Sequence, residues 1–408
     1  MNKKLLTLAV AAAMVAPTAA MAEAILYGKL HVSIDWADVE GVSTVPVIDS
    51  KGNVVGSAVA DYKGWGLNGG GDLPGEGRAS RIGVKGSEDL GNGLKAIYQV
   101  EMGVQLAEEN AVYGNPKGVG NAASSSDNTV YMRNTFVGLS GGWGTFVVGR
   151  NDTPMKTSTG KLDLFSDTMA DYNGTVGFND VRADNAVAYI SPNLSGFQLA
   201  AAAHSGAAST AGKGENINAD SIAEAYSIAG IYSNGPFYAA LAYESLGNEM
   251  YMNTTTSALG ETYPNGTLRA GYVNDDFTKW RLGLGLMNWN GFTLTGIYEE
   301  QSNLPNGQIS PLTSPEKLKL WQIQAGYAFG NEMVKAMYGS GNRDGRFDDA
   351  NTLKDLKNSI EGDYYTWAIA FDHNFSKRTK AYVLYTQYDD DVKNADWDGF
   401  SLGMIHEF

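Results

Sequence analysis

Apolar and polar residues alternate along much of the chain in stretches of about ten residues, the length of a strand that crosses a bilayer. In residues 26–36, Leu26 and Leu30 fall on one face, whereas His31 and Asp35 fall on the other. The same alternation returns in residues 280–298, 318–329, 364–372 and 400–408. A period of two predicts β-strands, each with one apolar face and one polar or small-residue face.

Two kinds of connection separate these stretches. Tight turns are predicted at seven places: Asp89–Asn92, Gly141–Gly142, Pro192–Gly196, Ser233–Pro236, Asn288–Gly291, Gly330–Asn331 and Asn374–Lys377. Longer connections are predicted at eight: 37–77, 103–130, 151–181, 204–222, 245–278, 300–317, 340–362 and 389–397. A soluble β-sandwich would also alternate, but short turns at one end and long loops at the other are typical of outer-membrane barrels. The sequence therefore predicts an all-β fold, a sixteen-stranded antiparallel transmembrane β-barrel whose first and last strands pair.

The N-terminus has the pattern of an export signal. Basic Asn2–Lys4 precedes an apolar run, Leu5–Ala16, and a small-residue cleavage site, Ala20–Ala22. We expect residues 1–22 to be removed and residues 23–408 to form a single barrel domain. No later stretch reaches the 18 or so consecutive apolar residues of a membrane-spanning helix.

Composition excludes several other classes. The 408 residues include no Cys, so neither disulfides nor thiolate metal sites are possible. The formal charge of −15 becomes −17 without residues 1–22, which carry two Lys and no acid; this balance argues against nucleic acid as a partner. The four His residues are scattered, and we expect no metal and no cofactor.

One motif resembles that of a hydrolase. Gly399-Phe400-Ser401-Leu402-Gly403 fits G-x-S-x-G, whose Ser is a nucleophile when it sits at a strand-to-helix elbow. Here the motif lies inside an alternating strand and no partner His is indicated. We therefore predict no catalytic residues and no enzyme activity.

Residues 80–101, SRIGVKGSEDLGNGLKAIYQVE, resemble the second hairpin of Gram-negative general porins. Leu26–Leu30, Phe136–Ser140 and Gly403–Phe408 resemble other strands of that family. The resemblance implies a homotrimeric pore in the bilayer of the outer membrane of a Gram-negative bacterium. It also implies that the third loop, residues 151–181, folds into the lumen as a constriction, and that ions and small hydrophilic solutes diffuse passively through the channel.

Basic residues are predicted on the channel wall. Alternation points Arg81 and Lys85 inward, opposite to Ile82. The resemblance places Arg133 and Arg182 in the basic cluster of the wall. Charged side chains on the inner face set the sign and size selectivity of a pore. The alternative is that they are ordinary inward charges solvated by channel water.

Acidic residues are predicted opposite them. Asp163, Asp167 and Asp171 recur every four residues in the third loop, so a helical turn would align them on one face. Alternatively, some of them hydrogen-bond the backbone of the loop itself. Together with the overall negative charge, these carboxylates predict a modest cation preference.

Aromatic residues near strand ends predict membrane-interface girdles: Trp36, Tyr298, Tyr327, Tyr365 and Tyr388. The alternative is a row of lumen aromatics that guides sugars. Two other functions remain open: a substrate-selective channel, which would use such a row or a site in the third loop, and a barrel that serves as an adhesin or an enzyme.

Overall fold

The computed structural model describes residues 23–48, 54–69, 78–106, 130–204, 221–246, 276–304, 317–344, 361–391 and 396–408. For residues 41–48 and 54–62 it describes the backbone alone. The predicted signal peptide, residues 1–22, lies outside these residues. Within them, none of the helices is long and apolar enough to cross a bilayer.

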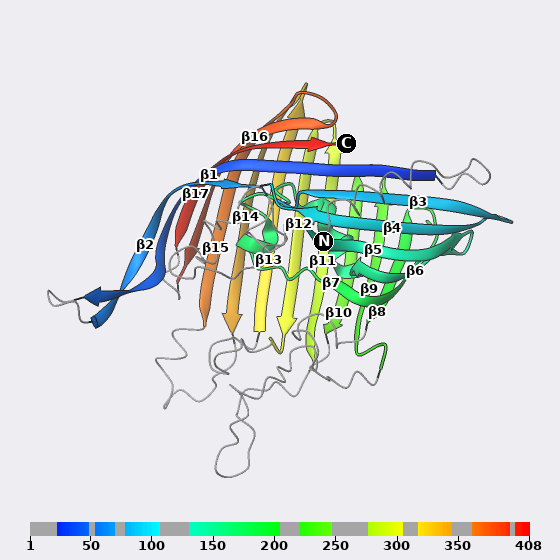
Figure 1. Ribbon diagram of the computed structural model, residues 1–408, viewed down its shortest axis with the longest axis horizontal. Helices are drawn as coiled ribbons and strands as arrows, with labels where there is room; N and C mark the ends of the chain where they lie inside the picture. Colours follow the sequence, from blue (N-terminus) through cyan, green and yellow to red (C-terminus); the bar gives the residue numbers. More distant parts are fainter. Residues whose placement is uncertain are drawn as a thin grey trace, which may run out of the picture.

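The chain folds into one closed antiparallel sheet of sixteen barrel positions (Figure 1). Two segments, β2 and β3, share one position. In chain order the strands are β1 (Glu23–Ile48), β2 (Val54–Asn68), β3 (Arg81–Gly91), β4 (Leu94–Val104), β5 (Val130–Gly141), β6 (Gly144–Asp152), β7 (Arg182–Ile190), β8 (Phe197–His204), β9 (Ala225–Asn234), β10 (Phe237–Leu246), β11 (Phe277–Trp289), β12 (Phe292–Ser302), β13 (Lys317–Phe329), β14 (Glu332–Asp344), β15 (Gly362–Asn374), β16 (Thr379–Asp390) and β17 (Trp397–Glu407).

The first and last strands close the barrel. β1 pairs with β17 from Lys29 opposite Glu407 to Val39 opposite Trp397. Beyond that ladder, Gly28 and Phe408 exchange backbone hydrogen bonds of 3.0 and 3.1 Å. Because the first and last strands pair with each other, neither is left as an edge strand, as the even strand count predicted.

β2 and β3 form one interrupted barrel strand. Along β1, Ser33 pairs with Asn68 of β2, and Lys29 pairs with Arg81 of β3. On the other side, the amides of Val104 and Leu106 donate to the carbonyls of Ser80 and Gly69 over 2.8 and 3.0 Å. Residues 69 and 80 thus sit next to each other in the wall.

The predicted first loop, residues 37–77, was wrong in part. β1 continues to Ile48 and pairs with β2 down to Ile48 opposite Val54, so much of this connection is a β-hairpin (Figure 1). Gly and Ser residues obscure the alternation there, whereas the backbone hydrogen bonds between the two segments do not depend on it. The seven predicted turns all lie where consecutive strands meet.

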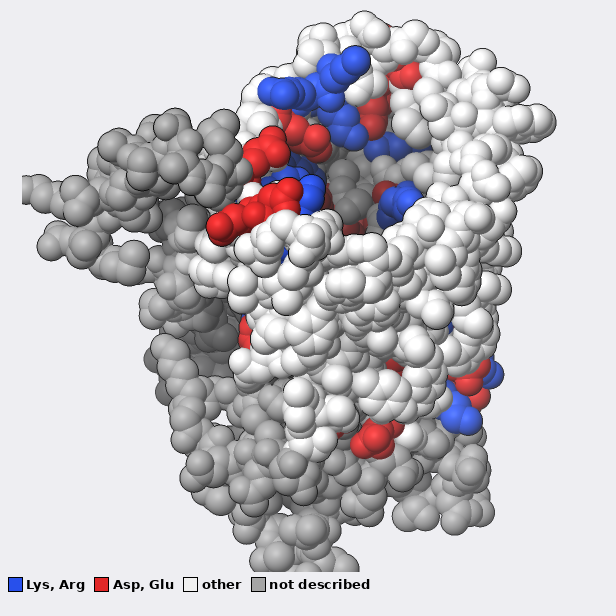
Figure 2. All heavy atoms as spheres, turned by 90° about the vertical axis from the view of Figure 1, so that its right-hand side faces the viewer, with Lys and Arg blue, Asp and Glu red and all other residues white. Residues whose placement is uncertain are grey.

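The two faces of the sheet differ as alternation predicted. On β13, Trp321, Ile323 and Tyr327 are exposed on the outer face, whereas Gln322 and Gln324 are buried on the opposite, inner face. Figure 2 shows an outer wall that is almost free of Lys, Arg, Asp and Glu. Such an apolar band suits lipid, while polar groups collect inside.

Glycines and tyrosines meet across strands. A Cβ atom built on Gly83, Gly103 or Gly403 would overlap the ring of Tyr27, Tyr131 or Tyr382, respectively. Aromatic rings laid over glycines of a neighbouring strand restore packing that glycine lacks. Gly403, the last residue of the G-x-S-x-G match, therefore has a packing role.

Candidate functional site

The third loop contains three short helical pieces: α2 (Pro154–Thr159), the 3-10 turn η1 (Gly160–Leu162) and α3 (Tyr172–Thr175). Thr153 caps α2, since its side chain accepts from the amide of Lys156 over 3.4 Å. Asp171 caps α3 in the same way, through the amide of Asn173 at 2.9 Å. Residues 163–171 between them form turns.

The loop is hydrogen-bonded to the inner face of several strands. The amide of Met155 donates to Ser227 of β9 over 3.0 Å. Thr295 of β12 donates to the carbonyl of Leu162 over 2.8 Å, and Tyr364 of β15 donates to that of Val176 over 2.6 Å. Backbone groups that would otherwise be buried without partners are satisfied in this way.

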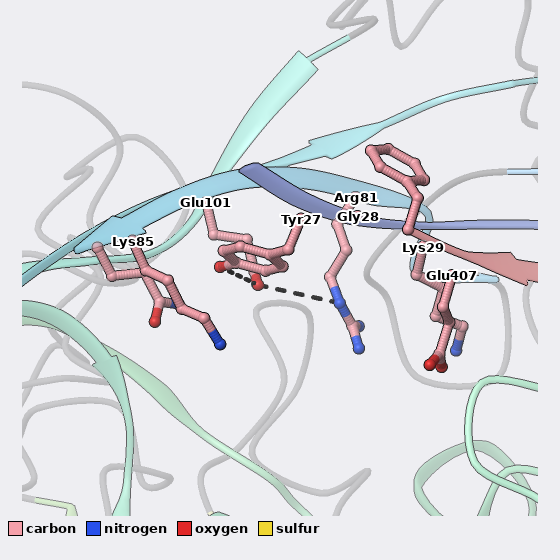
Figure 3. A pocket seen from close by; sticks show the side chains of 9 residues that line it. Tyr27, Gly28, Lys29, Arg81, Lys85, Glu101 and Glu407 are labelled. Atoms are coloured by element: carbon pink, nitrogen blue, oxygen red, sulfur yellow. Dashed lines mark hydrogen bonds and ion pairs between the residues drawn. The ribbon is translucent and has the colours of Figure 1, made fainter. Parts of the chain in front are cut away.

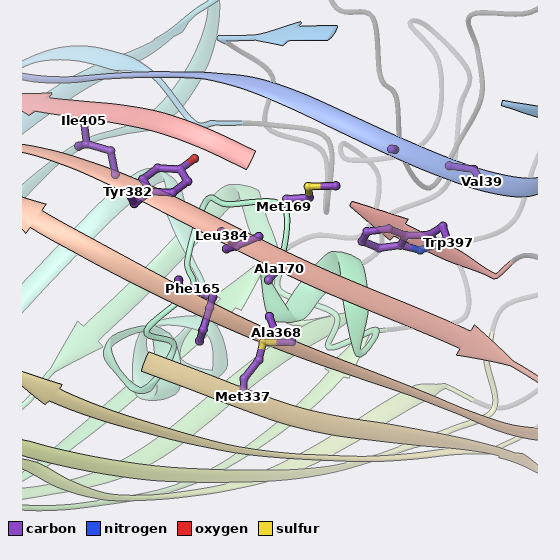
Figure 4. Packing of buried hydrophobic residues seen from close by; sticks show 12 residues of the cluster. Val39, Phe165, Met169, Ala170, Met337, Ala368, Tyr382, Leu384, Trp397 and Ile405 are labelled. Carbon is purple, nitrogen blue, oxygen red and sulfur yellow. The ribbon is translucent and has the colours of Figure 1, made fainter. Parts of the chain in front are cut away.

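Apolar contacts add to these bonds (Figure 4). Phe165 and Met169 of the loop are 0% and 1% exposed and pack in a cluster with Leu384 of β16. The Met169 methyl group sits directly over Gly399 of β17, where a Cβ would come within 1.6 Å of it. Gly399, the first residue of the G-x-S-x-G match, therefore provides the space into which Met169 fits.

A buried ion-pair network also holds the loop. Arg281 of β11, fully buried, donates to Asp180 of the loop over 2.7 Å and to Glu299 of β12 over 2.5 Å. Its guanidinium also donates to Thr159 over 2.8 Å. Burial by itself would raise the pKa of the Asp180 carboxyl, but the Arg281 guanidinium stabilises its charged form and holds the pKa below its ordinary value. A buried charge with two carboxylate partners fixes one geometry.

The three loop carboxylates have different roles. Asp163 accepts from the amide of Phe165 over 2.9 Å and from Gln324 over 2.7 Å. Asp171 accepts from the amides of Asp167 and Asn173. These two side chains therefore bond the loop backbone, which was the alternative interpretation. No helix aligns the three residues, because turns replace it and Asp167 has a positive φ of 60°.

Asp167 alone of the three reaches basic residues of the wall. Its carboxylate accepts from Lys29 of β1 over 2.6 Å and lies 3.9 Å from Arg81. Burial by itself would raise the pKa of Asp167, but Lys29 and Arg81 hold it below its ordinary value. For Asp163 burial prevails and raises the pKa to about 6. Burial and the neighbouring Asp163 also raise the pKa of Asp171.

The structure brings two of the four predicted basic residues together around one carboxylate. Arg133 of β5 donates to Glu101 of β4 over 2.7 Å, and Arg81 lies 3.9 Å from the same side chain. Arg182 of β7 does not reach Glu101; it lies 2.9 Å from Asp152 and donates to Asn134 of β5, the residue after Arg133, over 2.9 Å. Lys85 is exposed, with its ammonium 5.0 Å from the centre of the Tyr27 ring.

Two central residues were not among those predicted. Glu101 accepts from Arg133 and from the hydroxyl of Tyr27 at 2.9 Å, and Lys29 joins β1 to the third loop. Alternation along β1 and β4 would have placed both side chains inward. The pairing itself depends on contacts between residues 74 and 138 positions apart, which the sequence does not display.

A hollow opens at the end of the barrel where the short turns lie, and basic and acidic residues surround it (Figure 2). A cavity of about 390 Å³ in the barrel wall is lined by Tyr27, Gly28, Lys29, Arg81, Lys85, Gln99, Glu101, Glu407 and Phe408 (Figure 3). The predicted basic residues of β3 thus border open space.

Comparisons with known proteins agree with this architecture. A family model described as "Gram-negative porin" matches residues 9–393. The chain belongs to the Gram-negative porin family. Among its relatives, the major outer membrane protein P.IB of Neisseria gonorrhoeae is 28% identical over 395 residues, with 94% of this chain and 92% of the relative covered. P.IB of Neisseria meningitidis serogroup B is 29% identical over 389 residues, with the same coverage.

Solved porins share the fold of this porin. An anion-selective porin from Comamonas acidovorans has a TM-score of 0.59 and 21% identity, covering 95% of this chain and 100% of that one. Salmonella typhi OmpF, in complex with daunomycin, has a TM-score of 0.61 and 14% identity, covering 95% and 98%. This porin is therefore a sixteen-stranded channel protein of the outer membrane.

The aromatic girdle prediction needs one correction. Tyr327 and Tyr365 of this porin are each 40% exposed on the outer face, where a girdle belongs. Tyr388 instead shares the inner face, because its ring stacks on buried Trp397 at 6.2 Å and its hydroxyl donates to Asp390 over 3.0 Å. The outer end of β16 carries polar residues on both faces, which hid the parity. Across the described ranges, no three His, Asp or Glu side chains gather as metal ligands.

Proposed function

We propose that this porin passes ions and small hydrophilic solutes by passive diffusion through a water-filled lumen, and that the third loop folds into that lumen and narrows it. The observation that carries the proposal is the set of contacts from loop residues 155–176 to inner-face side chains of β9, β12 and β15. Arg81 and Lys85 of β3 border the cavity, and Arg133 of β5 pairs with Glu101, which also borders it.

The cavity is lined by three basic and two acidic side chains, an excess of positive charge that favours anions. Lys85 on the wall is exposed, and Arg81 has carboxylates only at 3.9 Å. The acids on which a cation preference would depend are engaged: Asp163 and Asp171 by amides, and Asp167 by Lys29. We therefore propose an anion preference at the constriction, opposite to the expectation from total charge.

One structural neighbour supports this sign, since the Comamonas acidovorans porin is described as anion-selective. The proposed constriction set is Arg81, Lys85, Arg133 and Arg182 on the wall, with Asp167 on the loop. Asp163 and Asp171 contribute by holding the shape of the loop.

Assembly and export complete the proposal. We propose that residues 1–22 are cleaved on export and that three copies of residues 23–408 associate in the bilayer. OmpT, an outer membrane protein of Vibrio cholerae and a structural neighbour with a TM-score of 0.54 and 12% identity, is described in a trimer form. Chemical cross-linking in native membranes should yield a species of three chains.

Planar-bilayer recording of the purified protein tests the function. We expect conductance that rises with salt concentration, closure in three steps, and a zero-current potential with chloride preferred over potassium. Absence of any conductance would remove the channel function. A clear potassium preference would remove the proposed sign and leave the channel in place.

A further inference from the structure

Three charged residues lie in one row across β3, β1 and β17 of the barrel wall. In the β1 ladders, Lys29 pairs with Arg81 of β3 on one side and with Glu407 of β17 on the other. All three border the 390 Å³ cavity (Figure 3). A basic, a basic and an acidic group therefore stand side by side across the same cavity wall.

The central lysine is not available to its acidic neighbour. The ammonium of Lys29 donates to Asp167 of the third loop over 2.6 Å and is only 11% exposed. Glu407 is exposed, and among the described residues it has no ion-pair partner. The third loop thus removes the cation that would otherwise neutralise Glu407.

Arg81, at the opposite end of the row, is only loosely paired with acidic side chains. Arg81 lies 3.9 Å from its two nearest carboxylates, beyond direct hydrogen-bond distance. Four residues along β3, Lys85 is exposed and faces the amide residue Gln99 across the ladder. Tyr27 lies between these two basic side chains in Figure 3.

The spacing fits a molecule that carries both charges. Arg81 and Glu407 are two strands apart, which places their backbones roughly 10 Å from each other. A zwitterion with its two charged groups on the order of 3 Å apart, plus one hydrogen bond of about 2.8 Å at each end, spans roughly 9 Å. A single small ion would satisfy only one end and meet the repulsion of the other.

We propose that this cavity is a binding subsite for zwitterionic α-amino acids in transit. The solute carboxylate bonds Arg81, with Lys85 beside it, and the solute ammonium bonds Glu407. The inference rests on the proposed diffusion function and adds a preferred solute class to it. Because all three groups are reached by water, the site is weak and slows solutes without trapping them.

Single-channel recording in about 0.1 M KCl, where screening is limited, tests the subsite. L-Alanine is added stepwise to the wild-type channel, and acetate and methylammonium, each bearing one of its charged groups, are added in separate runs. We expect alanine to reduce the conductance saturably, and each single-charge probe to half-saturate at a severalfold higher concentration.

Variants separate the subsite from the channel. Glu407→Gln should raise the half-saturating alanine concentration about fivefold, the upper range for an exposed ion pair, while Glu407→Asp retains binding. Glu88→Gln changes an exposed glutamate of β3 that does not line the cavity, and it should leave the half-saturating alanine concentration unchanged.

Three outcomes would overturn the subsite: a linear response to alanine, equal saturation by acetate, or no effect of Glu407→Gln. Each still leaves the KCl conductance, so the diffusion function stands. Loss of KCl conductance in the wild type would instead contradict the proposed function itself.

Discussion

Lys29 donates to Asp167 over 2.6 Å, although the residue directly opposite Lys29 in the β1–β17 ladder is Glu407. A strand residue and a loop residue, 138 positions apart, thus form the pair in place of two strand neighbours. This contact ties the third loop to the strand that closes the barrel. It also decides which charges remain for solutes.

Replacing Asp167 with Asn should strengthen the anion preference. The change removes one negative charge beside Lys29 and Arg81 while keeping the side-chain shape. One unit charge at about 6 Å in water is worth roughly 0.7 kcal/mol, which favours chloride and disfavours potassium by about threefold each, so the chloride-to-potassium permeability ratio should rise about tenfold. Zero-current potentials across a salt gradient measure it.

Asp38→Asn is the matched control for Asp167. Asp38 pairs with exposed Lys63, and its side chain alternates with those of Ala37 and Val39, which pack with the third loop on the opposite face of β1. Its loss should leave the permeability ratio within error. An unchanged ratio in Asp167→Asn would place Asp167 outside the ion path.

Replacing Gly399 with Val should displace Met169. The added carbon would overlap the Met169 methyl group, so the tip of the third loop must move away from β17. We expect a changed single-channel conductance and more current fluctuation. Gly296→Val is the control, because that position has ordinary space around it.

The double variant Gly399→Val with Met169→Ala gives a second check. Shortening Met169 makes room for Val, so the conductance should return toward the wild-type value. Failure of this rescue would show that the effect of Gly399→Val does not run through Met169.

Replacing Arg281 with Met should destabilise the protein strongly. Asp180 and Glu299 would lose their shared partner, and breaking a buried ion pair from one side costs about 3–5 kcal/mol. Guanidinium unfolding in detergent micelles measures the midpoint. Lys63→Met, which removes an exposed pair, should leave the unfolding midpoint nearly unchanged.

The packing of the loop should strengthen between pH 7.5 and pH 5. The Asp163 pKa of about 6 lies above its unfolded value near 3.8, so the folded protein binds this proton more tightly. Stability from this group is present at low pH and is lost as the pH rises through 6. The difference between the two pH values is about 1 kcal/mol.

Asp163→Asn should flatten that part of the pH dependence, read as unfolding midpoints at both pH values. The lowered pKa of Asp167 acts only below its ordinary range, outside this window. Asp171 has a raised pKa and acts in the same direction as Asp163. An identical pH slope in the wild type and in Asp163→Asn would contradict the assignment.

Much of the barrel was readable from sequence because each strand carries its own signal. Trp321, Gln322 and Ile323 alternate in sequence as they alternate between the two faces. The interrupted strand was not readable, since the meeting of Gly69 with Ser80 depends on hydrogen bonds from β4. The helical alignment of the loop acids failed because Asp163 and Asp171 bond nearby amides more favourably in turns.

The sequence by itself determined the strands, the turns and the inward parity of Arg81 and Lys85, since these follow from a period of two and from local turn chemistry. Only the tertiary structure decided which charged side chains form ion pairs with one another. Arg133 is matched by Glu101, Lys29 by Asp167 and Arg281 by Asp180, across separations that no local pattern records. The physical reason is that a buried charge requires a partner wherever the closed barrel and its third loop bring one near.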